Sequence, residues 1–295
     1  SDYELALMQA LQSELEANNE TGILRADEAL LSARIEYREQ LESFLLDMLS
    51  TAYNTDSAAL NVQLEELRLI IAEENLEQDK NRYNMGQIAE HQLAESEAAL
   101  RTAQLNLEAA QWDHEDRSAD FLFLTGLSWT PLLLPVPDEL DYPITDSENW
   151  LAIDSSIQRA KVRLQLQQLK LEQLPLNTAP YGYKLELKAK EQAERALERT
   201  ESASIRRYEQ LRRQLLHEKE TIKLRKEEKR IHEGLVQKAL AAYEEGLISR
   251  AALGQERIQL IQAELREKQS NSNYLSALIS MLVHSQTEEE SRAVQ

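Results

Sequence analysis

The side chains that most often bind metals or act as nucleophiles are scarce in this sequence, which contains no cysteine and five histidines. A metal site on a helix commonly uses two histidines one turn apart with an acidic partner, and no pair in this chain has that spacing. No glycine-rich phosphate loop and no Gly-x-Ser-x-Gly nucleophile motif is present. We therefore predict no metal site, no cofactor and no enzymatic activity. The histidines are His91, His114, His217, His232 and His284.

The chain is strongly acidic, with a formal charge of −19. Because a phosphate backbone would be repelled, we expect no nucleic-acid partner. The stretch from Arg206 to Arg230 is an exception, with ten Lys or Arg residues against five Glu. It either pairs with acidic neighbouring helices or forms a surface that lines a channel or meets a partner. No run approaches the roughly 20 apolar residues of a membrane helix, so we expect no direct insertion of this chain into a membrane.

Long helices are the expected secondary structure throughout. The 295 residues include only seven Gly and six Pro, and straight-chain residues such as Leu, Glu, Gln and Arg lose little rotamer freedom in a helix. Thr145 and Glu148 have the spacing of a capping box, which would open the fourth helix. The pattern predicts an all-α chain with helices at about 3–17, 24–83, 88–124, 148–174, 184–243 and 249–284.

The second half of the sequence repeats the first at an offset of 160 residues without a gap. Two glycines in register with a tyrosine are hard to obtain by chance in a chain with seven glycines. We therefore interpret the chain as a tandem duplication. Each repeat has a long helix of about 60 residues, a tight turn and a return helix of about 37 residues. Matched pairs include Tyr83 with Tyr243, Gly86 with Gly246, Ile88 with Ile248, and Leu93 with Leu253.

The long helices are too long for one compact domain, since about 60 residues span roughly 90 Å. Tyr208, Leu215 and Ile222 recur every seven residues, as the seam of a coiled coil does. So narrow a seam leaves a lone pair of helices marginally stable. We therefore expect each hairpin to pack against helices of the other repeat and of other subunits.

Gly86 and Gly246 suit the position just after a helix end, where the backbone takes a left-handed conformation. After Gly246 come Leu247 and Ile248, and then Ser249, which can cap the next helix. An ordinary hairpin turn would explain the glycine and the serine alone. Exposed apolar residues at the end of a long rod more often mark a docking site.

Two stretches, "RYNMGQIAEHQLAESEAALRTAQLNLEAAQWDHEDRSADFLFLTGL" and "AYEEGLISRAALGQERIQLIQAELREKQSNSNYLSAL", resemble the tip-and-return segments of the TolC-like outer-membrane efflux family. The most specific mark is Tyr-x-x-Gly-Leu-Ile-Ser, and the resemblance extends over most of the chain. It implies that three subunits close a twelve-helix tube whose tips meet a membrane-fusion adaptor. The implied partner-binding residues are Tyr83, Gly86, Gln87, Ile88, Tyr243, Gly246, Leu247, Ile248 and Ser249.

The sequence departs from the family in two places. The family has Asp six residues after the tip glycine, where it constricts the channel entrance, whereas this chain has Gln92 and Ala252. Family members also carry two strands per repeat that close a membrane β-barrel, and here only "NNETG" and "PLNTAPYGY" occupy those positions. Neither segment supplies two strands of about 9–11 residues. The resemblance therefore implies the helical tube without its strands, either in a natural barrel-less member or after their removal. The first tip, with Gln87 in place of Leu247, is expected to be the more polar one.

The predicted fold is a tandem repeat of antiparallel coiled-coil hairpins that assembles as a trimeric α-helical tube. We divide the sequence into a first repeat (1–126, tip near 84–88), a Pro-rich connector (127–147), a second repeat (148–285, tip near 244–249) and a disordered tail (286–295). The resemblance implies a non-catalytic duct of an export system in the extracytoplasmic envelope, in the periplasm, at the outer membrane or in the cell-wall space. Its implied partners are a homotrimer, the adaptor and an inner-membrane transporter. The alternative is a non-conducting coiled-coil scaffold or adaptor protein of the envelope.

Overall fold

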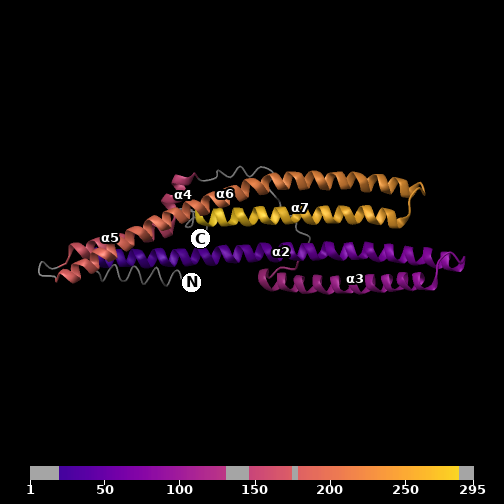
Figure 1. The fold of residues 1–295 in the computed structure, drawn as a ribbon, viewed down its shortest axis with the longest axis horizontal. Helices are drawn as coiled ribbons and strands as arrows, with labels where there is room; N and C mark the ends of the chain where they lie inside the picture. Colours follow the sequence, from indigo (N-terminus) through magenta and orange to yellow (C-terminus); the bar gives the residue numbers. More distant parts are fainter. Residues whose placement is uncertain (1–19, 131–145, 175–178, 286–295) are drawn as a thin grey trace. The chain divides into compact units, whose positions relative to one another are not determined.

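The computed structural model describes residues 20–130, 146–174 and 179–285, and every element within these ranges is a helix. The all-α fold class is confirmed. The expected helix at 3–17, most of the connector and the tail at 286–295 lie outside the described residues. No described helix has the length and apolar character needed to cross a membrane. The helices are α2 (Glu20–Asn84), α3 (Glu90–Thr125), α4 (Ser147–Ile153), α5 (Ser155–Glu172), α6 (Pro180–Glu244) and α7 (Arg250–Ser285) (Figure 1).

The helix bounds follow the sequence repeat. α2 and α6 each have 65 residues, α3 and α7 each have 36, and every bound of the second pair lies 160 positions after its counterpart, as 180 lies after 20. The long helices begin earlier than expected, because Gly22 and Gly182 lie in their first turns rather than in breaks. Pro180 suits a first helical position, where its fixed φ is already helical and its missing N–H has no partner to lose.

The predicted helix over 148–174 is wrong in one respect, since two helices, α4 and α5, occupy it. Asp154 separates them, and its side chain accepts a hydrogen bond from the backbone N–H of Ser156 (2.8 Å). A short acidic side chain competes for backbone donors in this way and favours a helix start over a helix interior. Asp146 is the N-cap of α4 and accepts from the N–H of Asn149, whereas the predicted cap Thr145 lies outside the described residues.

The helices form two compact units, and each unit contains segments of both repeats. Of the described residues, unit 1 comprises 20–45, 146–174, 179–215 and 277–285, and unit 2 comprises 46–130 and 216–276. The seam expected on the long helix α6 is present, because Tyr208, Leu215 and Ile222 are all buried.

Unit 2 is a single layer of helices in the order α6, α7, α2, α3 (Figure 1). α6 and α7 are joined by ion pairs from Arg266 to Glu228 and from Lys229 to Glu267. The second pair joins a cation of the basic run to an acidic residue of the neighbouring helix. A hydrogen bond from Arg225 lowers the pKa of Glu228 below its usual value. α3 and α6 are the edge helices of this layer.

The α2–α7 contact forms the apolar centre of unit 2. Leu60, Leu64 and Ile261 are buried together, with Leu67 and Leu265 packed against them. Nearer the turns the two helices approach closely, because a Cβ on Gly254 would lie 3.1 Å from Cγ1 of Ile71.

A buried charge pair fixes the other end of the same contact. The carboxylate of Asp56, 5% exposed, accepts hydrogen bonds from Lys268 Nζ (2.6 Å) and from Trp129 Nε1 (3.1 Å). Nearby, the buried hydroxyl of Thr55 lies 3.1 Å from the carbonyl oxygen of Arg117 on α3. These contacts connect the end of α3 and the middle of α7 to one site on α2.

Unit 1 is centred on Trp150 of α4. Its indole Nε1 donates to Ser204 Oγ on α6 (2.9 Å), and Ser204 donates to the carboxylate of Asp154. The rings of Tyr208 and His284 lie against the indole, with centroid distances of 5.7 and 5.9 Å. One buried side chain therefore joins α4, α6 and α7.

The position of His284 makes the stability of unit 1 dependent on pH. Burial, and next the guanidinium of Arg207, lower the pKa of His284 below its usual value, against the opposing effect of Glu42. The unfolded chain then takes up a proton more readily than the folded one. The contribution of His284 to the free energy of unfolding should be constant above about pH 6.5, the pKa of histidine in an unfolded chain. It should fall as the pH drops from there toward the pKa of His284 in the folded chain.

His284→Gln should therefore show a shallower loss of melting temperature on acidification from about pH 7 to 5. Thermal melts of both chains across this range measure the two slopes. Parallel slopes would show that another group causes the pH dependence.

Candidate partner-binding tips

The two helix-to-helix turns of unit 2 share one hydrogen-bonding pattern. Gly86 and Gly246 have φ values of +69° and +72°, in the left-handed region that was predicted for them. The N–H of Gly246 donates to the carbonyl of Tyr243 (2.9 Å), and that of Leu247 donates to the carbonyl of Ala242 (2.8 Å). The first turn has the equivalent pair of bonds. This is the Schellman arrangement, which pairs the last helical carbonyls and closes the turn.

Glycine substitutions should distinguish this backbone requirement from ordinary helix propensity. Gly246→Val is expected to lower the free energy of unfolding by about 1–2 kcal/mol, because a side chain is strained at positive φ. Gly234 lies inside α6, and beyond its own helical turn no atom lies within 4 Å of where a Cβ would stand, so Gly234→Ala should raise the free energy of unfolding by about 1 kcal/mol. Urea unfolding followed by circular dichroism measures both changes. If both substitutions changed the free energy of unfolding by the same amount in the same direction, Gly246 would have no special backbone role.

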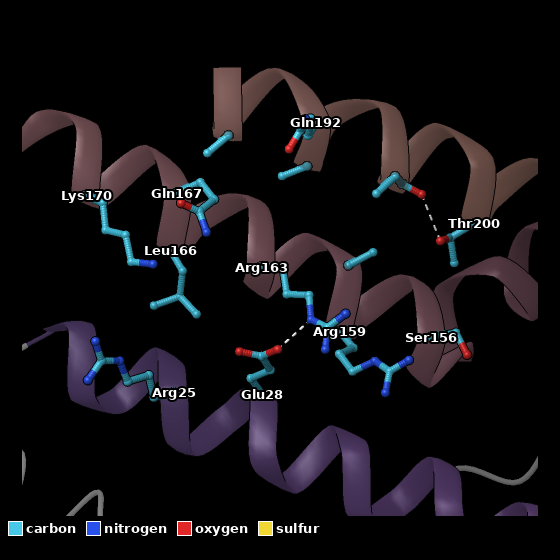
Figure 2. A pocket seen from close by; sticks show the side chains of 14 residues that line it. Arg25, Glu28, Ser156, Arg159, Arg163, Leu166, Gln167, Lys170, Gln192 and Thr200 are labelled. Atoms are coloured by element: carbon cyan, nitrogen blue, oxygen red, sulfur yellow. Dashed lines mark hydrogen bonds and ion pairs between the residues drawn. The ribbon is translucent and has the colours of Figure 1, made fainter. Parts of the chain in front are cut away.

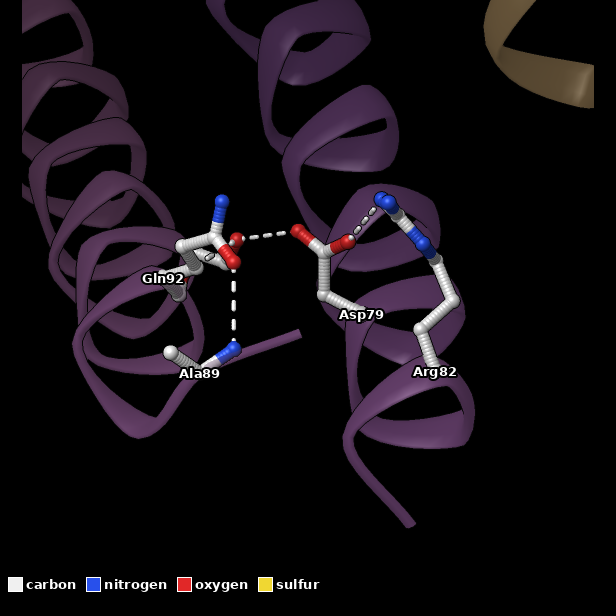
Figure 3. A network of polar contacts seen from close by, with 5 residues as sticks. Asp79, Arg82, Ala89 and Gln92 are labelled. Atoms are coloured by element: carbon white, nitrogen blue, oxygen red, sulfur yellow. Dashed lines mark hydrogen bonds and ion pairs between the residues drawn. The ribbon is translucent and has the colours of Figure 1, made fainter. Parts of the chain in front are cut away.

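The two turns restart their return helices differently. Ser249 caps α7 as predicted, since its Oγ accepts from the N–H of Ala252 (3.1 Å). Ala89 at the start of α3 has no side-chain acceptor, and the Oε1 of Gln92 instead accepts from the N–H of Ala89 (3.1 Å) (Figure 3). α7 gains a further acceptor from α2, because the carboxylate of Glu74 accepts from the N–H of Ala251.

Gln92 and Ala252 therefore take part in helix starts, Gln92 through its side chain and Ala252 through its backbone N–H. Close to Gln92, the carboxylate of Asp79 accepts from the hydroxyl of Ser96 and pairs with Arg82 (3.0 Å) (Figure 3). These bonds link the end of α2 to the beginning of α3. Asp79 therefore supplies the carboxylate next to the first turn. The tip motif did not point to this residue.

The apolar exposure of the tips differs from the expectation. Leu247 is 71% exposed, but Ile88 and Ile248 are half-buried. Met85 is 70% exposed, so the first tip also presents a large apolar side chain. The repeat alignment concealed it, because Met85 is matched with Glu245 at the 160-residue offset. The expectation of a more polar first tip therefore does not hold for its exposed surface.

A groove of about 800 Å³ lies beside the first tip, between α2 and α3. Ile88 and Gln92 lie at its tip end, and small residues of α3, including Ala99 and Ala103, line its floor. Because these residues of α3 are small, the groove has room for side chains of a partner. Among the described residues, no group of three or more His, Cys, Asp or Glu side chains is placed to hold a metal ion.

Comparison with known proteins identifies the fold. No protein-family model and no curated protein sequence matches the chain. Solved structures do match. The CmeC outer membrane channel of Campylobacter jejuni has a TM-score of 0.66 and 15% identity, over 93% of this chain and 70% of that one. A membrane protein from Pseudomonas aeruginosa has a TM-score of 0.62 and 12% identity, over 90% and 71%.

The outer membrane protein VceC of Vibrio cholerae also matches, with a TM-score of 0.58 and 11% identity, over 90% of this chain and 75% of that chain. At such low identity these matches establish the fold alone. The described helices have the TolC-like helical fold of these outer-membrane proteins, as the tip motifs predicted.

Proposed function

We propose that three copies of this chain close a helical tube that serves as a non-catalytic duct of an export system in the cell envelope. The observation that carries this proposal is the single helical layer of unit 2, because both of its edge helices leave apolar side chains uncovered. The fold shared with outer-membrane efflux channels supports the same role.

The uncovered side chains have the spacing of a helix-packing seam. On α3, Leu105 and Trp112 are exposed seven residues apart, and Phe123 farther along is 93% exposed. On α6, Leu224 is 72% exposed and Ile231 follows it seven residues later. Heptad spacing on an exposed face is typical of helices that pack against another helix. We infer that α3 of one copy packs against α6 of the next.

The charges of the two edges are complementary. α3 carries eight acidic residues and two arginines. The part of α6 from Leu216 to Arg230 carries six Lys or Arg residues and four Glu. Two α3 edges would repel each other, whereas α3 against α6 brings opposite charges together. Such a head-to-tail contact between unlike surfaces produces a ring when its rotation closes.

The tips supply the second contact of the proposed assembly. Met85 and Leu247 are exposed apolar residues in the two turns, and Tyr83 and Tyr243 precede them by two and four residues. We propose that these residues bind a membrane-fusion adaptor, and through it an inner-membrane transporter. The proposal therefore implies a location in the extracytoplasmic envelope, in the periplasm, at the outer membrane or in the cell-wall space.

The assembly is tested by the mass of the protein in solution. Light scattering at increasing concentration should show a trimer, and Leu224→Asp or Trp112→Asp should raise its dissociation constant by more than about 30-fold. Leu247→Asp, at a tip, should leave the trimer intact. A chain that stays monomeric at every concentration would contradict the tube and favour a non-conducting scaffold.

A further inference from the structure

A pocket in unit 1 has a charge opposite to that of the chain as a whole. It has a volume of about 430 Å³ and lies between α2, α5 and α6 (Figure 2). Its lining includes four cations, Arg25, Arg159, Arg163 and Lys170, and one carboxylate, Glu28. The lining therefore carries a formal charge of +3, whereas the whole chain carries −19.

The helical repeat of α5 places three of these cations on one face. Arg159, Arg163 and Lys170 follow one another at intervals of four and seven residues, which is the spacing of one helix face. Figure 2 shows their side chains extending from α5 toward α2, where Arg25 and Glu28 face them. The buried Leu166 lies on the same face and packs beneath them.

Most of this positive charge has no counterion among the residues that the structure describes. Arg163 pairs with Glu28 through its Nε. In the described part of the chain, Arg25, Arg159 and Lys170 form no ion pair. Cations gathered around one pocket repel each other, and an anion between them would remove that repulsion.

We propose that this pocket binds a phosphate-bearing anion with at least two negative charges. Guanidinium groups bind phosphate through two parallel hydrogen bonds, and the lysine ammonium adds a point charge. α6 contributes Ala189, Ala193 and Ala196 to the lining, and such small side chains leave room for the organic part of a ligand. The volume is within the range of small-molecule sites.

The phosphate comes either from a soluble phosphorylated molecule or from a lipid headgroup, since the two share the recognised chemistry. The site goes beyond the proposed duct, because it lies in unit 1 and needs neither the tips nor the edge helices of unit 2. A failure of the duct proposal would therefore leave it unaffected.

Isothermal titration of the full chain with pyrophosphate at low ionic strength tests the site. The double variant Arg159→Gln/Lys170→Gln should weaken binding by at least about tenfold. Lys161→Gln, an exposed cation of the same helix outside the pocket, should change it by less than about twofold. Glu28→Gln should tighten binding several-fold, because it removes the one carboxylate and releases Arg163. A purely structural role for these residues does not predict a gain in affinity.

Circular dichroism controls for folding, and removal of mutually repelling cations should leave the melting temperature unchanged or raise it. If the double variant does not fold, Arg25→Gln provides the same test with a cation that enters the pocket from α2. Equal losses for Lys161→Gln and the pocket variants would show diffuse charge attraction and overturn the site.

Vesicle binding separates the two sources of phosphate. Co-sedimentation with vesicles that contain cardiolipin, whose headgroup carries two phosphates, but not with phosphatidylcholine vesicles, and its loss in the double variant would identify a headgroup. Pyrophosphate binding without vesicle binding would identify a soluble ligand. Binding of neither probe would overturn the proposal.

Discussion

Asp56→Ala is expected to lower the free energy of unfolding by about 3 kcal/mol. The Asp56 carboxylate is buried and accepts hydrogen bonds from Lys268 and Trp129. Its removal leaves a largely buried ammonium without a counterion and an indole N–H without an acceptor, and both changes are unfavourable. The side chain of Lys268 is 25% exposed, so water offsets part of the loss and the low end of the usual range applies.

Two further variants make this prediction specific. Asp56→Ala/Lys268→Met removes both charges and should recover most of the stability, since no unpaired ion remains. Asp113→Ala removes an exposed pair with Arg117 on α3 and should cost less than about 1 kcal/mol. Urea unfolding at neutral pH measures all of these variants. An equal loss for Asp56→Ala and Asp113→Ala would show that burial of the first pair contributes nothing.

The second large effect concerns the tips. Leu247→Asp and Met85→Asp are each expected to weaken binding of the cognate adaptor by about 30-fold, because each places a charge at the centre of an apolar contact. Both side chains are largely exposed, so helicity should not change. Affinity measurements with the purified adaptor, alongside circular dichroism, test both statements.

The repeat supplies the matched control. Gln87→Asp introduces the same residue at the position equivalent to Leu247, and its effect should be small because that side chain is already polar. Gln111→Asp, on the exposed side of α3, controls for added charge away from the tips. Normal binding by Leu247→Asp together with loss of binding by Gln111→Asp would mean that the turns connect helices and do not bind the adaptor.

Local signals predicted the elements well. The left-handed glycines Gly86 and Gly246, the cap Ser249 and the buried heptad of α6 all follow from residue type and short spacing. The exceptions are the early starts of α2 and α6 and the break at Asp154, because an aspartate inside a helical pattern is compatible with both a surface position and a new helix start. The hydrogen bond from Ser204 on α6 to the Asp154 carboxylate, which holds the aspartate at the junction of α4 and α5, is a distant contact that local sequence does not reveal.

Contacts between distant segments were beyond the reach of the sequence. Asp56 and Lys268 are 212 positions apart, and neither differs in sequence context from the many solvated charges around it. The basic pocket has the same origin, since its cations come from α2 and α5 while its small side chains come from α6. At the tips, the repeat alignment drew attention to equivalent positions and away from Met85, which has no apolar counterpart.

The hydrogen-bonded closure of the two turns has a kinetic consequence. A flexible loop would lose about 1–2 kcal/mol of backbone entropy for each residue that a partner orders. In these turns the left-handed glycine and its paired N–H groups already hold Met85 and Leu247 in place before any partner arrives. Association at the tips should therefore be limited by diffusion and mutual orientation rather than by folding. Changes within the apolar contact should then act mainly by shortening the lifetime of the complex.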